Sequence, residues 1–368
     1  LCSTYEGNAD FSGSTYKGEA DFSGSTYENK EKNVLFSTSD SPSIYEGKAD
    51  FSHSTYQGDT DFSHSTYQGE ANFYKSTYKN KEKNVLFSTS DSPSIYQGEA
   101  KFYGSTYEGW ADFSGSTYEK DVLFSSHVPR STYDRANFSG STYKGKAEFS
   151  DSTYQWADFS GSTYEGEANF YSSIYKDRAR FRESTYEQDV LFSTSALCST
   201  YEGNADFSGS TYKGGANFTG STYNDVADFS GSIFYQKVYF GADGDNSSFS
   251  RFTDCAPQFY DETNRKNTLF GSPDNDFSTE NGRGYPIYRS LDGLPLGCSF
   301  LTAEQKEYLA DKFQEIDETK NKLLEIKDPK EKAELSKKLQ ALTEELHEWR
   351  EEATTVKAED AAPREEDN

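Results

Sequence analysis

Methionine is absent from this 368-residue chain, and cysteine, histidine and proline are scarce, with four, four and nine copies. The four cysteines (Cys2, Cys198, Cys255, Cys298) are too few for a disulfide scaffold of this length. Only Cys255 and Cys298 are candidates to pair with each other. No apolar run approaches the roughly 20 residues that span a bilayer, so membrane insertion is not expected.

The sequence signatures of common enzymes are also missing. There is no phosphate-binding glycine loop, no Cys-x-x-Cys pair and no His-Glu-x-x-His motif. His53 and His64 occupy equivalent corners one repeat apart, and the coil deduced below puts them on opposite sides of the molecule. The serines and threonines of the repeats have no histidine partner. We therefore expect no enzyme activity, no catalytic or cofactor-binding residues and no metal site.

Acidic residues far outnumber basic ones, and the net charge is −25. This charge argues against nucleic acid or an anionic membrane as a direct partner. The hydrophobic fraction is only 33%, yet Tyr and Phe number 28 each. Burial must therefore rest on columns of aromatic rings and not on an interior of Leu, Ile and Val.

The aromatic residues recur in steps of five and six over the first two-thirds of the chain. The repeated unit has 11 residues, A-D-F-S-G-S-T-Y-x-G-x, and occurs about twenty times. So short a period predicts one long body in which every turn resembles the last. The predicted core ladder begins with Phe11, Tyr16, Phe22, Tyr27, Phe51, Tyr56, Phe62, Tyr67, Phe73 and Tyr78.

The start of the chain repeats an internal block. Residues 1–18 recur without change at 197–214, where a complete repeat precedes them, and residues 29–45 recur at 80–96. With no methionine present, we expect the true N-terminus to be missing, so a targeting signal cannot be judged. We expect a soluble protein, with the cytoplasm favoured.

Each unit alternates inward and outward in the way a β-strand does. Ala9 and Phe11 share one face while Asp10 points the other way, and Ser14 and Tyr16 share a face opposite Thr15. Small, turn-prone residues separate these short stretches. A chain that runs straight and turns repeatedly is predicted to form a β-solenoid.

The repeats resemble the pentapeptide repeat family, whose consensus is A-(D/N)-(L/F)-x-x. Residues 9–13, 20–24, 136–140 and 205–209 match this consensus, and the S-T-Y segments match it more loosely with one extra residue, as in an 11-residue variant of the family. The resemblance covers about residues 3–240. It implies a right-handed, four-sided β-helix.

Two units make a coil of about 22 residues with Phe, Tyr, Phe and Tyr inside. About ten coils at roughly 4.8 Å each give a rod of about 48 Å. An 11-residue coil is rejected, because each ring buries about 150–250 Å² and two cannot fit in so tight a loop. Nine-residue gaps between aromatics, such as Tyr27 to Phe36 and Phe36 to Tyr45, indicate loops pushed out at corners.

The repeat pattern fails after residue 240, and four regions are predicted. Residues 1–240 form the β-helix, 241–300 an irregular cap rich in Gly, Asp and Asn, and 301–357 two helices. A capping box at Thr302 to Gln305 begins the first helix, and Asp328-Pro329 begins the second. Residues 358–368 are acidic and expected to be disordered.

The second helix carries apolar residues at steps of four and three. This short heptad seam consists of Leu335, Leu339, Leu342, Leu346 and Trp349. It predicts either a hairpin with the first helix, or packing onto the cap, or a homodimer through the C-terminal helices. The seam is the candidate interaction site of the chain.

A non-enzymatic scaffold that presents its surface to a protein partner is the leading functional hypothesis. The family resemblance adds an alternative, since the family includes quinolone-resistance proteins that mimic a DNA duplex and occupy DNA gyrase, a type II topoisomerase. Residues 1–240 hold 33 acids and 20 bases, a net of −13. A duplex of about 48 Å carries roughly 28 negative charges, about twice as many.

The outward column next to the inward alanines also weakens the mimic hypothesis. It is predicted to contain Asp10, Leu35, Asp61, Leu86, Asp112, Asn137, Asp158, Arg180, Asp206 and Asp228, with leucines and an arginine among the acids. Ice binding through the repeated threonines (Thr15, Thr26, Thr55, Thr66) is a second alternative. Because each strand supplies one threonine, it offers single columns and not a flat two-column array.

Overall fold

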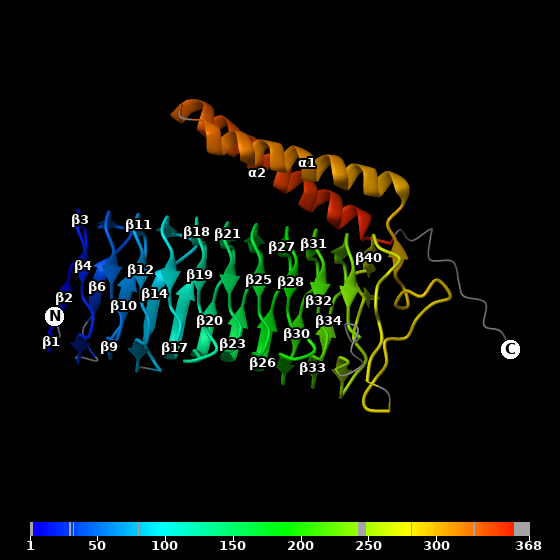
Figure 1. Ribbon diagram of the computed structural model, residues 1–368, viewed down its shortest axis with the longest axis horizontal. Helices are drawn as coiled ribbons and strands as arrows, with labels where there is room; N and C mark the ends of the chain where they lie inside the picture. Colours follow the sequence, from blue (N-terminus) through cyan, green and yellow to red (C-terminus); the bar gives the residue numbers. More distant parts are fainter. Residues whose placement is uncertain are drawn as a thin grey trace.

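A computed structural model describes residues 3–28, 31, 33–79, 81–241, 248–280, 282–326 and 328–356. It shows a parallel β-solenoid with a helical hairpin lying along one side (Figure 1). Partners in neighbouring coils lie 22 residues apart where no loop intervenes, as in Thr4 to Thr26 and Thr55 to Thr77. The predicted 22-residue coil is confirmed.

Each coil has four faces, built in chain order. The first face holds the T-Y strands that open each coil. They are β1 (Thr4–Tyr5), β5 (Thr26–Tyr27), β9 (Thr55–Tyr56), β13 (Thr77–Tyr78), β29 (Thr200–Tyr201), β33 (Thr222–Tyr223) and β37 (Arg251–Phe252).

The second face holds the A-D or V-L strands that follow. They are β2 (Ala9–Asp10), β6 (Val34–Ser37), β10 (Thr60–Phe62), β14 (Asn84–Ser88), β30 (Ala205–Asp206) and β34 (Ala227–Asp228). Four longer strands run from the first face into the second and join both into one 17-stranded sheet. These are β17 (Thr106–Phe113), β20 (Thr132–Asn137), β23 (Thr153–Asp158) and β26 (Ile174–Arg180).

The third face is a separate 12-stranded sheet. Its strands are β3 (Thr15–Tyr16), β7 (Ile44–Tyr45), β11 (Thr66–Tyr67), β15 (Ile95–Tyr96), β18 (Thr117–Tyr118), β21 (Thr142–Tyr143), β24 (Thr163–Tyr164), β27 (Thr185–Tyr186), β31 (Thr211–Tyr212), β35 (Ile233–Phe234), β40 (Leu269–Phe270) and β41 (Ser299–Phe300).

The fourth face is a 10-stranded sheet that closes each coil. Its strands are β4 (Ala20–Asp21), β8 (Ala49–Asp50), β12 (Ala71–Asn72), β16 (Ala100–Lys101), β19 (Val122–Leu123), β22 (Ala147–Glu148), β25 (Ala168–Asn169), β28 (Val190–Leu191), β32 (Ala216–Asn217) and β36 (Val238–Tyr239).

Aromatic rings fill the interior in stacked columns. Phe51 stacks on Phe73 in the next coil at 4.8 Å between ring centroids, and meets Phe62 from the opposite face edge to face at 5.1 Å. Both geometries are favourable for aromatic pairs. The ten predicted ladder residues all point inward, and Phe11, Tyr16 and Phe22 in the first described coil are only partly buried.

Buried serines stitch consecutive coils together. The backbone N–H of Ser76 donates to Oγ of Ser105 at 3.1 Å, and this Oγ donates to the carbonyl oxygen of Phe73 at 3.0 Å. The same pattern recurs at the serine before each T-Y pair, for example where Ser162 and Ser184 meet. Because the corners interrupt the sheet ladders, these hydroxyls satisfy backbone groups that would otherwise be buried without a partner.

The corners explain the glycines of the repeat and the two early histidines. Gly13 has φ of +67°, and His53 and His64 hold the same left-handed geometry at equivalent corners, each with φ of +56°. His53 lies between the fourth and first faces and His64 between the second and third. They occupy different corners of the rod, as predicted.

The solenoid continues past residue 240, so the predicted boundary falls one coil short. Strand β37 pairs in register with β33, and β40 with β35. The inward positions of this eleventh coil are taken by Phe252, Phe259, Phe270 and Phe277. Its corners are long irregular loops, one of which carries the antiparallel pair β38 (Tyr260–Asp261) and β39 (Lys266–Asn267). The cap is therefore a distorted continuation of the stack.

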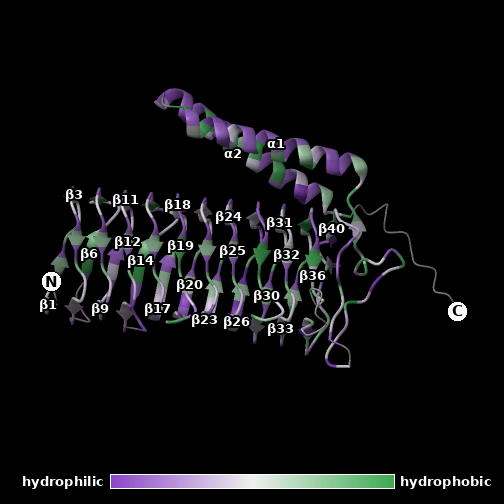
Figure 2. Ribbon diagram, viewed as in Figure 1, coloured by the Kyte–Doolittle hydropathy of each residue, from purple (hydrophilic) through white to green (hydrophobic). Residues whose placement is uncertain are grey.

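Two helices follow, α1 (Ala303–Glu325) and α2 (Pro329–Ala353). The predicted capping box at Thr302 and Gln305 is present, and the Asp328 side chain accepts from the backbone N–H groups of Lys330 and Glu331. The helices run antiparallel above the third face (Figure 1). Most residues of both helices are hydrophilic (Figure 2). The predicted acidic tail, 358–368, lies outside the described residues.

Candidate functional site

The helical hairpin is anchored at the C-terminal end of the solenoid by a small apolar cluster. Ile233 and Leu269 from the third face, and Leu301 after β41, pack with residues of both helices. The helical members of this cluster are Leu309, Phe313, Ile316, Leu342 and Leu346. The cluster is separate from the aromatic core of the coils, so the hairpin has a hydrophobic attachment of its own.

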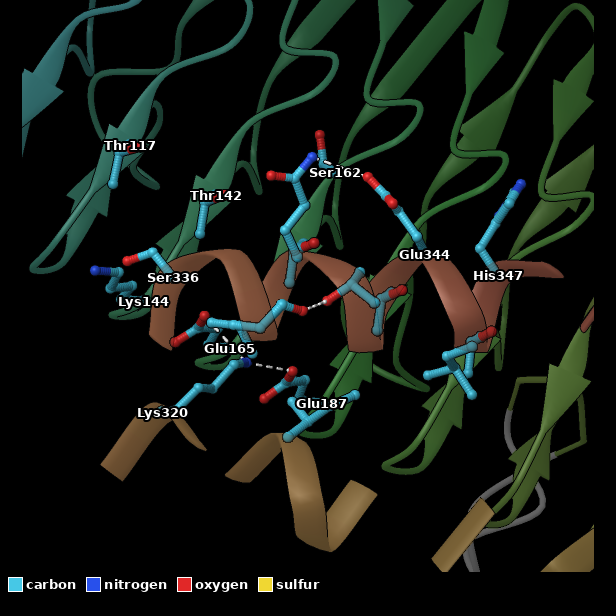
Figure 3. A pocket seen from close by; sticks show the side chains of 18 of the residues that line it. Thr117, Thr142, Lys144, Ser162, Glu165, Glu187, Lys320, Ser336, Glu344 and His347 are labelled. Atoms are coloured by element: carbon cyan, nitrogen blue, oxygen red, sulfur yellow. Dashed lines mark hydrogen bonds and ion pairs between the residues drawn. The ribbon is translucent and has the colours of Figure 1, made fainter. Parts of the chain in front are cut away.

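Away from this cluster, charged side chains hold the hairpin to the third face. Lys320 Nζ of α1 lies 3.0 Å from Glu165 Oε1 and 2.6 Å from Glu187 Oε1 (Figure 3). Burial disfavours the ammonium, but the carboxylates of Glu187 and Glu165 outweigh it and raise the pKa of Lys320. Lys213 pairs with Asp317 at 2.9 Å. The contacts place the charged partners on equivalent positions of successive coils.

Two further ion pairs tie the helices to each other. Lys312 lies 2.9 Å from Glu345, and Lys338 lies 2.9 Å from Glu315. Near the base of the hairpin, Lys266 of the eleventh coil bonds the Glu351 carboxylate at 2.7 Å. The hairpin is thus braced as a unit and attached most firmly at its base.

A cleft of about 1560 Å³ lies between the hairpin and the third face. Its floor is a column of outward threonines at the spacing of neighbouring parallel strands, and its roof includes polar residues of α2 (Figure 3). The floor threonines are Thr117, Thr142, Thr163, Thr185 and Thr211. The lining from α2 includes Ser336, Gln340, Thr343, Glu344 and His347.

The charges of the lining are balanced. Six acidic residues (Glu119, Glu165, Glu183, Glu187, Glu344, Glu348) and six basic residues (Lys120, Lys144, Lys213, Lys320, Lys332, Arg350) contribute to it. Several of them pair with each other, as Lys144 does with Glu119 at 2.9 Å. The cleft therefore has no net charge. Apolar side chains of the two helices, Phe313, Ile316, Leu323, Leu339 and Leu346, share its lining with hydroxyl and amide groups.

Arg350 closes the base of the cleft. Its side chain is only 3% exposed, and its guanidinium bonds Nδ1 of His347 at 2.7 Å and Glu351 Oε1 at 3.2 Å. Burial lowers the pKa of Arg350, while the Glu351 carboxylate supports the charged form. Because an arginine stays ionised in such a setting, this group is a fixed positive charge between α2 and the corner at Gly209.

The predicted heptad seam faces the inside of the hairpin. Leu342 and Leu346 are buried in the apolar cluster, and Leu339 and Trp349 pack against it. The Trp349 ring also stacks on Tyr308 of α1 at 4.9 Å, and Leu335 is partly exposed. This packing agrees with the predicted hairpin. A homodimer through the seam would have to replace these contacts between the two helices.

The sequence also suggested Cys255 and Cys298 as the two cysteines that could pair with each other. Cys255 and Cys298 are both free thiols, and burial raises the pKa of Cys298 to about 12. Within the described part of the chain, no group of three or more His, Cys, Asp or Glu side chains could hold a metal ion. Neither described helix has an apolar stretch that could cross a membrane.

The acidic column of the second face has the composition predicted. Strand register aligns Asp10 with Leu35, Leu86 with Asp112, and Asp158 with Arg180.

The cleft between the hairpin and the third face was not predicted from the sequence. The helix-capping motifs and the heptad seam do not indicate against which face of the solenoid the hairpin packs. The glutamates at equivalent positions of successive coils and the lysines of α1, such as Lys320, were a possible sequence signal for this contact. Such residues are, however, common on any acidic surface.

Comparisons with protein-family models, with curated proteins and with solved structures found no match to this chain. Its solenoid and the cleft beside the hairpin are therefore the basis on which a function has to be inferred.

Proposed function

We propose that this chain is a non-enzymatic repeat scaffold that holds a segment of a partner protein in the cleft between its hairpin and its third face. The volume of the cleft is the main support. At about 1560 Å³ it exceeds the roughly 300–1,000 Å³ of pockets that enclose small molecules. A polypeptide segment is a ligand of suitable size.

The chemistry of the cleft favours a peptide of low net charge that carries both polar and apolar side chains. Threonine hydroxyls, Gln340 and Ser336 can donate to and accept from a peptide backbone, and the balanced charges neither attract nor repel strongly. The floor is a regular array because five consecutive coils, from β18 to β31, each place one threonine at the same position. A peptide that lies along the solenoid axis would therefore meet the same donor and acceptor at each coil.

We also propose that the chain belongs to the pentapeptide repeat family. The support is the four-sided coil with alanine and phenylalanine of each A-(D/N)-F segment inside. The DNA-mimic alternative has less support, because Leu35, Leu86 and Arg180 interrupt the acidic column. Ice binding by the third face has less support too, since the hairpin covers part of its threonine column.

A random-peptide display library, selected against the full chain, tests the cleft. Thr163→Trp fills the floor of the cleft, and Thr77→Trp is the matched control at an outward threonine of the first face. We expect selected peptides to bind the wild type and Thr77→Trp equally, and Thr163→Trp at least about tenfold more weakly. Failure to enrich any peptide, or equal binding to all three proteins, would contradict the proposal.

A further inference from the structure

A second surface stands out where the first face turns into the second. The residue just before the first inward residue of each second-face strand (Ala, Val or Thr60) forms a column along this corner. In many coils it is short and polar, as at Asn33, Asp59, Asn84 and Asn204. In four consecutive coils it is instead Trp110, Arg135, Trp156 and Arg178, aligned by strand register.

The two indole rings touch across the intervening arginine. Trp110 and Trp156 belong to coils two apart, yet their ring centroids are 5.3 Å from each other with an angle of 30° between the planes. Both side chains are half-buried, and Nε1 of Trp110 donates to Oδ2 of Asp112 at 3.3 Å. At this distance and angle the two rings overlap in part, and together they form one aromatic cluster on the outside of the rod.

Planar polar groups border this aromatic cluster. Arg180 lies 5.8 Å from the Trp156 ring and bonds Asp158 at 3.3 Å, and Asn137 donates to Asp112 at 3.2 Å. Arg135 is half exposed beside Asp134. The side chain of Arg178 is exposed. Donors and acceptors thus surround the rings on both sides.

The fold does not require these residues. Coils with asparagine or aspartate in the same column keep the same strand register, for example at Asn84 next to Trp110. The five arginines of residues 1–240 all fall between 130 and 182, and two of the three tryptophans lie in the same coils. Strands β17, β20, β23 and β26 also run through this corner, with register shifts beside Trp110 and Trp156.

The surface matches the two sides of a sugar ring. A pyranose presents a face of C–H groups that packs on an aromatic plane, and hydroxyls at its edge that bond planar carboxylate, amide and guanidinium groups. The positive charges of Arg135, Arg178 and Arg180 are balanced by the negative charges of Asp112, Asp134 and Asp158. A polyanionic ligand would therefore gain little electrostatic attraction at this surface. We propose that the Trp110 to Arg178 column binds a neutral glycan chain running along the solenoid axis.

Native electrophoresis of the full chain through gels that contain a soluble polysaccharide tests this proposal. Glucomannan, galactomannan and hydroxyethyl cellulose serve as neutral probes, and polygalacturonate as the anionic one. We expect at least one neutral probe to retard the protein. Trp110→Asn and Trp156→Asn, which introduce the residue that Asn84 and Asn204 supply in other coils of the column, should weaken this binding about tenfold or more. Leu35→Asn, an outward change on the second face, is the control.

Tryptophan fluorescence reports binding without any substitution in the Trp110 to Arg178 column. In a Trp349→Phe background, Trp110 and Trp156 are the only tryptophans, so the binding neutral probe should shift their emission. The proposal is overturned if no neutral probe retards the protein or changes the emission. It is also overturned if binding persists in the folded Trp→Asn variants, or if polygalacturonate alone binds, which would indicate an anion site on the arginines.

Discussion

Replacing Ser105 with alanine isolates the serine contacts that join the coils. Ser105 is fully buried, and its Oγ accepts from the backbone N–H of Ser76 and donates to the carbonyl oxygen of Phe73. Alanine would leave both buried without a hydrogen bond. Because each unsatisfied buried group costs about 1–3 kcal/mol, the free energy of unfolding should fall by about 2–6 kcal/mol.

Thr106 provides the matched control, because it is the next residue and points outward. Thr106→Ala removes a β-branched side chain from the surface of the sheet and should cost less than about 1 kcal/mol. Both variants are compared by equilibrium urea unfolding, followed by circular dichroism and by tyrosine fluorescence. Equal stability of Ser105→Ala and Thr106→Ala would refute the idea that the serine hydroxyls hold the coils together.

Three further predictions concern the core and the hairpin. Burial raises the pKa of core tyrosines such as Tyr96 and Tyr164 well above the value of about 10 of an unfolded chain. The contribution of these neutral, buried tyrosines to the stability of the fold is therefore complete below pH 10 and is lost as the pH rises further. Tyrosinate absorbance should appear together with loss of the circular dichroism signal. Ionisation of the tyrosines while the solenoid stays folded would contradict this. Lys320→Ala should weaken the attachment of the hairpin by about 1–2 kcal/mol and speed hydrogen exchange in the second half of α1, whereas the exposed Lys322→Ala should not. Leu342→Ala should cost about 2–5 kcal/mol of hairpin stability while tyrosine signals of the coils keep their midpoint, and a shift of both midpoints would show that the two cores are not separate.

The repeat region could be predicted almost completely from the sequence. The spacing of Phe and Tyr decides the coil length, because rings must stack on rings, and Tyr45 on Tyr67 at 4.9 Å is what a 22-residue coil requires. The outward column from Asp10 to Asp228 follows from the same alternation. Where a motif is copied many times, the local pattern and the packing agree at every copy.

The eleventh coil was missed because its aromatics are spaced irregularly. Its four inward positions are taken by Phe252, Phe259, Phe270 and Phe277. Long corner loops separate these residues, and the A-D-F and S-T-Y motifs are absent from this coil. Stacking on Tyr223 and Phe229 places Phe252 and Phe259 despite this. Ring stacking is a tertiary interaction, and no local sequence pattern reports it.

The cleft was beyond prediction for a related reason. The heptad seam of α2 indicates an apolar stripe but not its partner, and α1, the cap and a second copy were all candidates. The choice of α1 depends on the cluster around Leu309 and Phe313, and the direction of the hairpin on pairs such as Lys320 with Glu187. The pair of Lys320 and Glu187 joins residues 133 positions apart, and no local pattern reports such a contact.

The position of the hairpin is the central claim, because the proposed cleft exists only if α2 lies over the third face of its own chain. Spin labels at Gln97 and Gln340, two residues that line the cleft, report on it by double electron–electron resonance in a variant without cysteines. We predict one narrow distance distribution that persists when labelled protein is diluted with unlabelled protein. A broad distribution would contradict a fixed hairpin, and a signal that disappears on dilution would show that the helices pair between molecules.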